Sequence, residues 1–417
     1  MATNNVWKDN ELRDLIEVRA AEVAGYLTVG ADSYFGDQLV GKRNGGTYRF
    51  VRKDAGKYVR GKNITGQGST LVETEVPMTI QVGNVMVDTD FVEAVTDVKW
   101  DKEIAQPCSK ALIEGLTQDV INSDIGRANT AFVGAGWAPL IKANSYLRSV
   151  STEDRYGFLD PMVESILPNA GEAFKPLTKP SLDARGDVTS MGGTEYRMQQ
   201  FLPSFEISAD LADELASATV KSYTASSVSV TDSDGVTRTE EFDILELNNV
   251  SEDIPVGTPL FIEDVVATNL IGNKTSSPKA FIVYEQISAG KVKVRKNEFA
   301  GQGTKDAIFK DGTNVTAAAL ENKKLVNTIK EGSYYTGLIR LNGTMEFDTL
   351  KKQDWSNAEL TTSGIEGITI HCARAVNVEA GTNKTRWAVA ALAGIVEPKG
   401  VAYVCIKDEI PNQVVVM

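Results

Sequence analysis

Apolar residues recur at helical spacing in three parts of the chain. The first part, residues 5–24, has apolar positions among many charges at Leu12, Leu15, Ile16 and Val23. The second, residues 104–120, has them at Ile104, Cys108, Leu112, Leu116 and Val120. The third is the stretch APLIKANSYLRSV, residues 138–150. We therefore predict an N-terminal amphipathic helix, which either packs on the core or docks on a partner, then a long helix and a shorter one. Pro107 either opens the long helix or kinks it.

Between the first two helices the pattern changes to strict alternation. TYRFVRK, residues 47–53, and TLVETEVPMTIQV, residues 70–82, predict two extended arms separated by a glycine-rich middle at residues 61–68. A long hairpin of this kind has little apolar surface of its own. We expect it to project from the molecule.

Short alternating segments also dominate residues 224–331. They are SSVSV, EEFDILEL, TPLFIED, KAFIVYEQI and GKVKVRK, separated by Gly, Asp-Gly and Pro turns. This pattern is typical of a small antiparallel barrel or sandwich. Residues 150–205 and the residues after 331 instead mix short apolar runs with loops. The sequence thus predicts an all-β module inserted into an α+β protein.

The C-terminal part contains the most apolar stretches. GITIHCARAV predicts a strand, and TNKTRWAVAALAGIVEPKGVAYVCI, residues 382–406, is interpreted as one late core strand and its exit.

Charge is unevenly distributed along an acidic chain of formal net charge −13. Eight cations lie between residues 42 and 62 against one acid, Asp54, and they are Lys42, Arg43, Arg49, Arg52, Lys53, Lys57, Arg60 and Lys62. Such a basic segment, interleaved with Tyr48, Phe50 and Tyr58, favours an acidic partner. The alternative is a solvated basic loop.

Groups that carry chemistry are few. His371 is the single histidine, so a multi-histidine metal site is excluded within one chain, and a structural role at a strand or subunit contact is favoured over catalysis. Cys108, Cys372 and Cys405 are widely spaced and odd in number, which indicates free thiols. FVGAGWAPL lacks the spacing of a dinucleotide loop, and TDSDGVTRTEEFD lacks that of a calcium loop. We expect no metal, no cofactor, no catalytic residues, no signal peptide and no membrane span.

The order of these elements resembles the P22-like major capsid proteins of tailed bacteriophages, which have the HK97 fold. The C-terminal segment from Glu366 to Ile406 carries the motif part of the resemblance, at Gly367, Ile368, Ile370, Arg374, Thr385, Arg386, Val389, Gly394 and Pro398. Ala388, Ala390 and Ala391 depart from the more usual Asp-Val-Leu-Tyr run of that family, and Glu397-Pro398 reverses its Pro-Glu.

The resemblance implies a domain plan. It comprises an N-terminal arm (1–40), an extended loop (41–90), a spine helix with the peripheral and part of the axial domain (91–223), the inserted β-barrel (224–331), and the axial domain with the C-terminal strands (332–417). The extended loop is implied to lie over a neighbouring subunit, where its eight cations meet acids such as Asp88, Asp90 or Glu93. One loop of the inserted domain is implied to reach an adjacent capsomer. The best candidate is the Thr231 to Glu241 hairpin, with Asp232, Asp234, Arg238, Glu240 and Glu241.

The function implied is that of a non-enzymatic shell protein. Copies would form hexamers and pentamers of an icosahedral capsid, with scaffolding and portal proteins as partners, and would enclose double-stranded DNA without reading its sequence. The location implied is the virion, after assembly in the host cytoplasm. Three alternatives stay open, namely an encapsulin-like compartment, a cytosolic enzyme without a recognisable constellation, and a surface β protein.

Overall fold

The computed structural model describes most of the chain. The described residues are 25–32, 47–53, 73–90, 106–167, 181–182, 188–191, 193–231, 237–349, 359–365, 368–377 and 382–409. The predicted N-terminal helix lies outside them. They form two compact units, each assembled from three separate stretches of sequence. The first is Met1–Tyr48, Met78–Val120 and Met345–Gly394, and the second is Arg49–Pro77, Ile121–Thr344 and Ile395–Met417.

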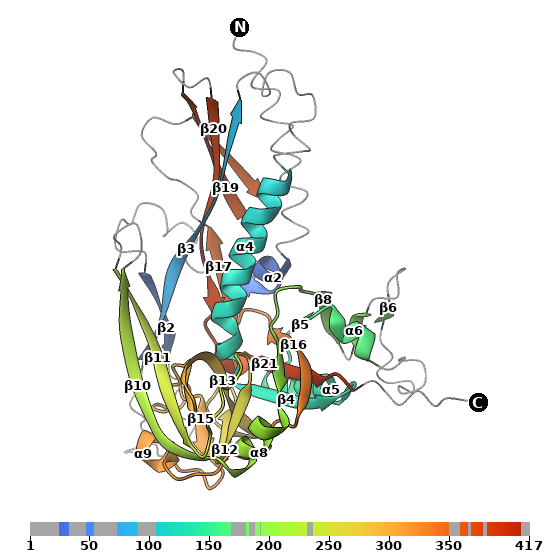
Figure 1. Ribbon diagram of the computed structural model, residues 1–417, viewed down its shortest axis with the longest axis vertical. Coiled ribbons are helices and arrows are strands. Elements are labelled where there is room, and N and C mark those ends of the chain that lie inside the picture. Colours follow the sequence, from blue (N-terminus) through green and yellow to red (C-terminus); the bar gives the residue numbers. More distant parts are fainter. Residues whose placement is uncertain are drawn as a thin grey trace, which may run out of the picture. The chain divides into compact units, whose positions relative to one another are not determined.

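The first unit is built on a sheet with one long helix (Figure 1). Its strands follow the order β1-β17-β20-β19-β18, with β3 paired to β20 and β2 paired to β3. Residues 49–53 of β2 and 73–77 of β3 belong to the second unit. The bounds are β1 Ala31–Asp32, β2 Thr47–Lys53, β3 Glu73–Asp90, β17 Met345–Thr349, β18 Glu359–Ile365, β19 Ile368–Asn377 and β20 Thr382–Ile395. The helices are α2 Gly25–Thr28 and α4 Gln106–Asp124. The prediction of two extended arms is confirmed by β2 and β3.

The long helix α4 confirms the second predicted helix. Pro107 is its second residue, so it opens the helix, where its missing N–H costs no hydrogen bond. Leu112, Leu116 and Val120 are buried at their predicted spacing. Gly83 on β3 marks a close approach in this unit, because a Cβ there would lie 3.1 Å from Leu112 Cδ1 and 3.6 Å from Val389 Cγ1.

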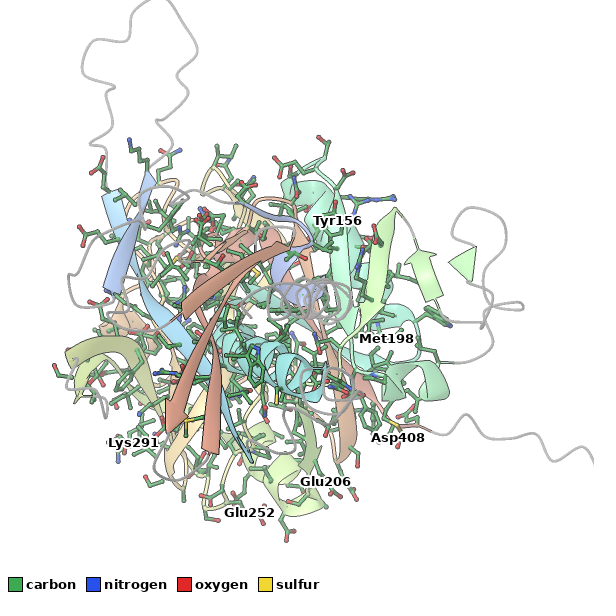
Figure 2. The ribbon with its side chains drawn as sticks, turned by 90° about the horizontal axis from the view of Figure 1, so that it is seen from above. Tyr156, Met198, Glu206, Glu252, Lys291 and Asp408 are labelled. Carbon is green, nitrogen blue, oxygen red and sulfur yellow. The ribbon has the colours of Figure 1, made fainter. Side chains whose placement is uncertain are left out.

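The second unit contains two sheets. The larger follows the order β4-β21-β16-β5-β8-β7-β6, with β9 also paired to β16. Its strands are β4 Thr130–Ala135, β5 Arg155–Leu159, β6 Ser181–Leu182, β7 Val188–Met191, β8 Thr194–Met198, β9 Ser204–Ile207, β16 Gly332–Leu341 and β21 Val401–Lys407. Tyr156 and Met198 mark the neighbouring parallel strands β5 and β8 (Figure 2). The unit's helices are η3 Ile125–Arg127, α5 Ala138–Val150, α6 Met162–Ile166, α8 Ala209–Ser217, α9 Ala317–Leu320 and η4 Pro398–Gly400.

Helix α5 spans the predicted residues 138–150 and supplies much of this unit's core. Leu140, Ala143 and Leu147 pack with Ile339 of β16 and Val404 of β21. Every residue of β21 from Val401 to Ile406 is buried, as expected for a strand inside a sheet that is covered on both faces.

The smaller sheet is the predicted all-β module. Its order is β10-β11-β14-β13-β12-β15, and all its pairs are antiparallel. The strands are β10 Thr219–Thr231, β11 Thr237–Asn248, β12 Pro259–Thr268, β13 Lys274–Ser288, β14 Lys291–Arg295 and β15 Ala307–Phe309. Residues 324–325 bridge Thr219 of β10 to Ile262 of β12, which closes the sheet as a barrel. The α+β class and the predicted order of spine helix, inserted β module and C-terminal strands are confirmed.

The core strand predicted in residues 382–406 is present as β20, but the part interpreted as its exit forms a further strand. The stretch forms two strands of different sheets, β20 and β21, separated by the 3-10 turn Pro398–Gly400. Glu397 accepts a hydrogen bond from the Lys399 backbone N–H, which fixes the turn between them.

The predicted domain boundaries stay a prediction. β10 begins at Thr219, five residues before the expected start of the module at residue 224. Both the module and the larger sheet belong to the second unit, where the Ala280 N–H donates to the Asn129 carbonyl and Thr130 Oγ1 donates to the Pro278 carbonyl.

Candidate functional site: an ion-pair cluster and a projecting hairpin

The described residues hold no group of three or more His, Cys, Asp and Glu side chains that could bind a metal ion. His371 lies in β19, opposite Ala388 and Thr362, which confirms the strand predicted around it. Cys108 and Cys405 are free, and burial raises the pKa of the Cys405 thiol. None of the helices in the described ranges is long and apolar enough to cross a membrane.

Charged side chains meet instead in a cluster around Arg52 in the second unit. Alternation along β2 leaves Val51 and Lys53 exposed and turns Arg52 inward, where only 6% of it is accessible. Its Nη2 lies 3.0 Å from Asp306 Oδ1 and 3.1 Å from Glu397 Oε1. The same nitrogen donates to the Thr304 carbonyl at 3.0 Å. One guanidinium therefore joins three stretches that are far apart in sequence.

Asp306 reaches this position from a tight loop of the β module. Its backbone N–H donates to the Glu298 carbonyl at 2.7 Å, and its Oδ2 accepts from the Glu298 N–H at 2.9 Å. Its carbonyl accepts from the Thr268 N–H at 3.2 Å, next to β15. The hydrogen bonds of the loop thus hold the Asp306 carboxylate in place independently of its contact with Arg52.

Glu397 and Lys399 come from the turn between β20 and β21. Lys399 is fully buried, and its Nζ donates to the Leu270 carbonyl at 3.3 Å and to the Gly303 carbonyl. The same Nζ lies 3.8 Å from Glu397 Oε1. This turn is therefore tied to the β module by a lysine as well as through Arg52.

Burial and charge act in opposite directions on the titrating groups of the cluster. Burial alone would lower the pKa of Arg52, but Asp306 and Glu397 outweigh it and hold that pKa above its usual value. Burial would raise the pKa of Asp306, yet Arg52 and Lys279 keep it below its usual value. Lys279 is buried above the Phe281 ring, and burial lowers its pKa to about 8. Each charge thus stabilises the ionised form of the other, and Arg52 and Asp306 are both ionised at neutral pH.

This geometry corrects one expectation for the basic segment. Arg52 makes its ion pairs inside its own unit, so it is not an exposed cation offered to a neighbour. Lys53 is exposed as expected, and Arg49 lies in β2 with its side chain not described. The other five predicted cations lie outside the described residues, and they are Lys42, Arg43, Lys57, Arg60 and Lys62.

The acids proposed as their partners are only partly described. Asp88 and Asp90 lie in β3, where their Cα atoms pair with those of Lys384 and Thr382 in the same unit. Glu93 lies outside the described residues.

The predicted hairpin is present. β10 and β11 pair up to Thr231 opposite Thr237, so the segment between them is a hairpin end. Asp232 and Asp234 lie outside the described residues, and Arg238 and Glu240 lie in β11 with side chains not described. Glu241 is only half-exposed and pairs with Lys296 Nζ at 2.6 Å within its own chain. The intercapsomer contact expected at Glu241 stays a prediction, for a side chain that is already paired within its own chain.

Sequence reasoning missed Asp306, Glu397, Lys399 and Lys279. The sequence holds a signal for Glu397, Lys399 and Lys279, because each is a charged residue within or between apolar strands. Glu397 and Lys399 interrupt AGIVEPKGVAYV, and Lys279 begins KAFIV. Such charges are rarely buried unless they are paired. For Arg52 the signal was its position two residues from Phe50, on the same face of a strand.

No known protein-family profile and no curated protein matches the sequence. Solved structures do resemble the chain over most of its length. One is from Mycobacterium phage Che8, with 8% identity, coverage of 90% of this chain and 89% of that chain, and a TM-score of 0.41. Another is the head structure of Helicobacter pylori bacteriophage KHP40, with 9% identity, coverage of 88% and 86%, and a TM-score of 0.43. A third is the holo-SrpI encapsulin complex of Synechococcus elongatus, with 8% identity, coverage of 87% and 83%, and a TM-score of 0.40. The solved structures similar to this chain are mainly bacteriophage capsids, with an encapsulin among them.

Proposed function

We propose that the chain is the major capsid protein of a tailed bacteriophage, a structural subunit that assembles into an icosahedral shell around the genome. The observation that carries the proposal is the order of elements in the described chain. An extended two-stranded segment precedes a long helix, a closed β module is inserted into a larger sheet, and the C-terminal strands complete both units. This is the order that the sequence resemblance to P22-like coat proteins implies.

The finer parts of the proposal concern partners. Copies form pentamers and hexamers, a scaffolding protein directs their closure, and a portal protein occupies one vertex. The shell encloses double-stranded DNA without sequence-specific contacts, and the acidic chain, of net charge −13, offers no net electrostatic attraction to the phosphate backbone. Assembly takes place in the host cytoplasm and the product is the virion.

In this proposal the ion pairs of Arg52 within one chain help to position residues that contact a neighbouring subunit. Arg52 anchors β2 to Asp306 and Glu397, which fixes the position of the neighbouring exposed residue Lys53. Lys53 and Arg49, with the cations beyond them, remain the proposed contacts to a neighbouring subunit. Individual exposed pairs contribute about 0–1 kcal/mol, but each is repeated in every copy of a shell.

Light scattering of the purified chain, with and without a co-expressed scaffolding protein, tests the function. We expect particles far larger than a dimer, and in infected or reconstituted material an absorbance spectrum dominated by nucleic acid. Particles that enclose protein cargo instead would favour the encapsulin-like alternative. A chain that remains monomeric or dimeric in all these conditions, over a range of salt, contradicts the proposal.

A further inference from the structure

The β10–β11 pair extends beyond the rest of its sheet (Figure 1). Within the described ranges, β11 pairs with β14 only over Phe242–Glu246, and β10 is bridged on its outer side only near Thr219. Over residues 227–231 and 237–241, which face each other in the register of the two strands, the described strands thus form a two-stranded ribbon. Side chains on both of its faces are exposed, since Ser227 and Ser229 are exposed on one face and Val228, on the other, is 44% accessible.

A two-stranded ribbon with two exposed faces is only marginally stable in water. Both of its outer edges carry backbone N–H and C=O groups that the described residues do not pair. Proteins usually protect such edges with charged side chains, bulges or prolines.

The two edges of this ribbon differ in that protection. The β11 edge carries Arg238, Glu240 and Glu241 within five residues. The β10 edge, SYTASSVSVT from Ser222 to Thr231, has no charge and no proline, in a chain of which 24% is charged. Its one bulge lies between Val220 and Ser222, before this stretch begins. β10 is therefore the edge left open to another strand.

We propose that β10 pairs with β10 of a second copy, antiparallel across a two-fold axis. The proposal rests on the proposed function, in which many copies assemble, and it names the partner surface of the hairpin. Antiparallel self-pairing places each residue opposite one from the same uncharged stretch, so no like charges meet and polar Ser and Thr alternate with Val and Ala. It also closes on itself, since the same edge serves both copies, which prevents open-ended growth through this edge.

Cysteine crosslinking tests the pairing in the full chain. In an antiparallel self-pair the numbers of two facing residues have a constant sum. If Ser227 lies on the axis, Ser227→Cys forms a disulfide with itself, and Ala225→Cys does so only with Ser229→Cys in mixed assemblies. Facing Cα atoms in such pairs are about 4.5–5.5 Å apart, within the reach of a disulfide. The parent chain is the control for crosslinks formed by the three native cysteines. Thr239→Cys, on the charged β11 edge, is the matched control for the introduced cysteines.

We expect crosslinks between copies that obey one constant sum of residue numbers, whichever residue lies on the axis, and none from Thr239→Cys. A second pair of variants tests the cause. Lysine at the residue that the crosslinks place on the axis brings two cations face to face and should abolish the crosslink of the flanking positions. If that residue is Ser227, the variant is Ser227→Lys, and Ser227→Thr, uncharged and strand-forming, should keep the crosslink.

Failure of the pairing can be told apart from failure of the proposed function. Shells that form while no combination of variants along β10 crosslinks overturn the pairing and leave the function standing; this is also the outcome if another segment of the same chain covers β10. Crosslinks with one constant sum in a dimer that never forms a shell support the pairing and contradict the function. The absence of both shells and crosslinks overturns both.

Discussion

Arg52 Nη2 lies 3.0 Å from Asp306 Oδ1, an ion pair between side chains 254 residues apart in which both are almost completely buried. Because a buried charge is stable only with its partner, this pair fixes the second strand of the chain to a loop of the β module. Glu397, at 3.1 Å from the same nitrogen, adds the turn before β21.

Loss of the cation should therefore destabilise the protein much more than loss of its exposed neighbour. Arg52→Met leaves Asp306 and Glu397 without it, and we expect the free energy of unfolding to fall by about 3–5 kcal/mol. Lys53→Met, on the next residue of the same strand, should change it by less than about 0.5 kcal/mol. Urea unfolding of both variants measures the difference. Equal effects of the two substitutions would show that the cluster does not anchor β2.

Lys279 should make stability rise with pH in a defined window. Burial lowers its pKa to about 8 in the folded protein, below the ordinary value of 10.5. Between about pH 8 and 10 the unfolded chain therefore holds a proton that the folded chain has released, so raising the pH favours folding. Lys279→Met should be more stable than the parent at pH 7 by roughly 3 kcal/mol, and the gain should shrink toward pH 10.

Lys274 is the control for this prediction, because it lies on the same strand but is exposed. Lys274→Met should leave the free energy of unfolding nearly unchanged at every pH. A parent chain whose stability stays flat or falls from pH 8 to 9.5, while Lys279→Met behaves in the same way, contradicts the assignment of a neutralised buried lysine.

Two glycines of the first unit should respond to substitution in opposite directions. Gly83 faces Leu112 Cδ1 at 3.1 Å from an ideal Cβ, so Gly83→Val should overpack the helix against the sheet and cost about 1–3 kcal/mol. Gly115 is an exposed residue inside α4 with nothing within 4 Å of an added Cβ. Gly115→Ala should stabilise the protein by roughly 0.5–1 kcal/mol. Thermal unfolding of both variants is the measurement, and a destabilising Gly115→Ala would be inconsistent with the described α4.

The sequence pattern predicted elements well where one periodicity was sustained. Residues 138–150 form a helix with the predicted bounds, because an amphipathic repeat begins next to a proline that suits a helix start. The strands of the β module were predictable for the same reason, since each alternates between turns. Periodicity reports the local backbone and the buried face of each element.

Contacts between segments that are far apart in the sequence were not predictable in this way. Residues 387–406 are apolar almost throughout, and nothing in that pattern says that its two halves belong to different sheets; only the charges of Glu397 and Lys399 interrupt it. Arg52 was interpreted as a contact residue because its neighbours are charged. Its position two residues from Phe50, on the same face of the strand, indicates instead that it points inward. Its partner Asp306 lies too far along the chain for any local pattern to connect the two.

The inserted module should fold in isolation with a reduced free energy of unfolding. One substitution, at Asp306, should restore part of that free energy. In isolation, residues 218–331 lack Arg52, Glu397 and Lys399, which leaves the buried carboxylate of Asp306 with Lys279 as its cation. Asp306→Asn should therefore stabilise the isolated module, yet destabilise the full chain, where it leaves Arg52 without its main partner. Amide dispersion in NMR spectra and urea unfolding of both forms test this. A change of the same sign in both contexts would rule out the proposed role of the cluster.

Cryo-electron microscopy of the particles formed by the full chain tests the central claim most directly. We expect closed icosahedral shells in which this chain occupies both pentamers and hexamers, with the β10–β11 hairpins meeting in pairs at two-fold axes between capsomers. Small soluble oligomers, or regular assemblies without closed icosahedral symmetry, would contradict the proposal that the chain is a capsid subunit.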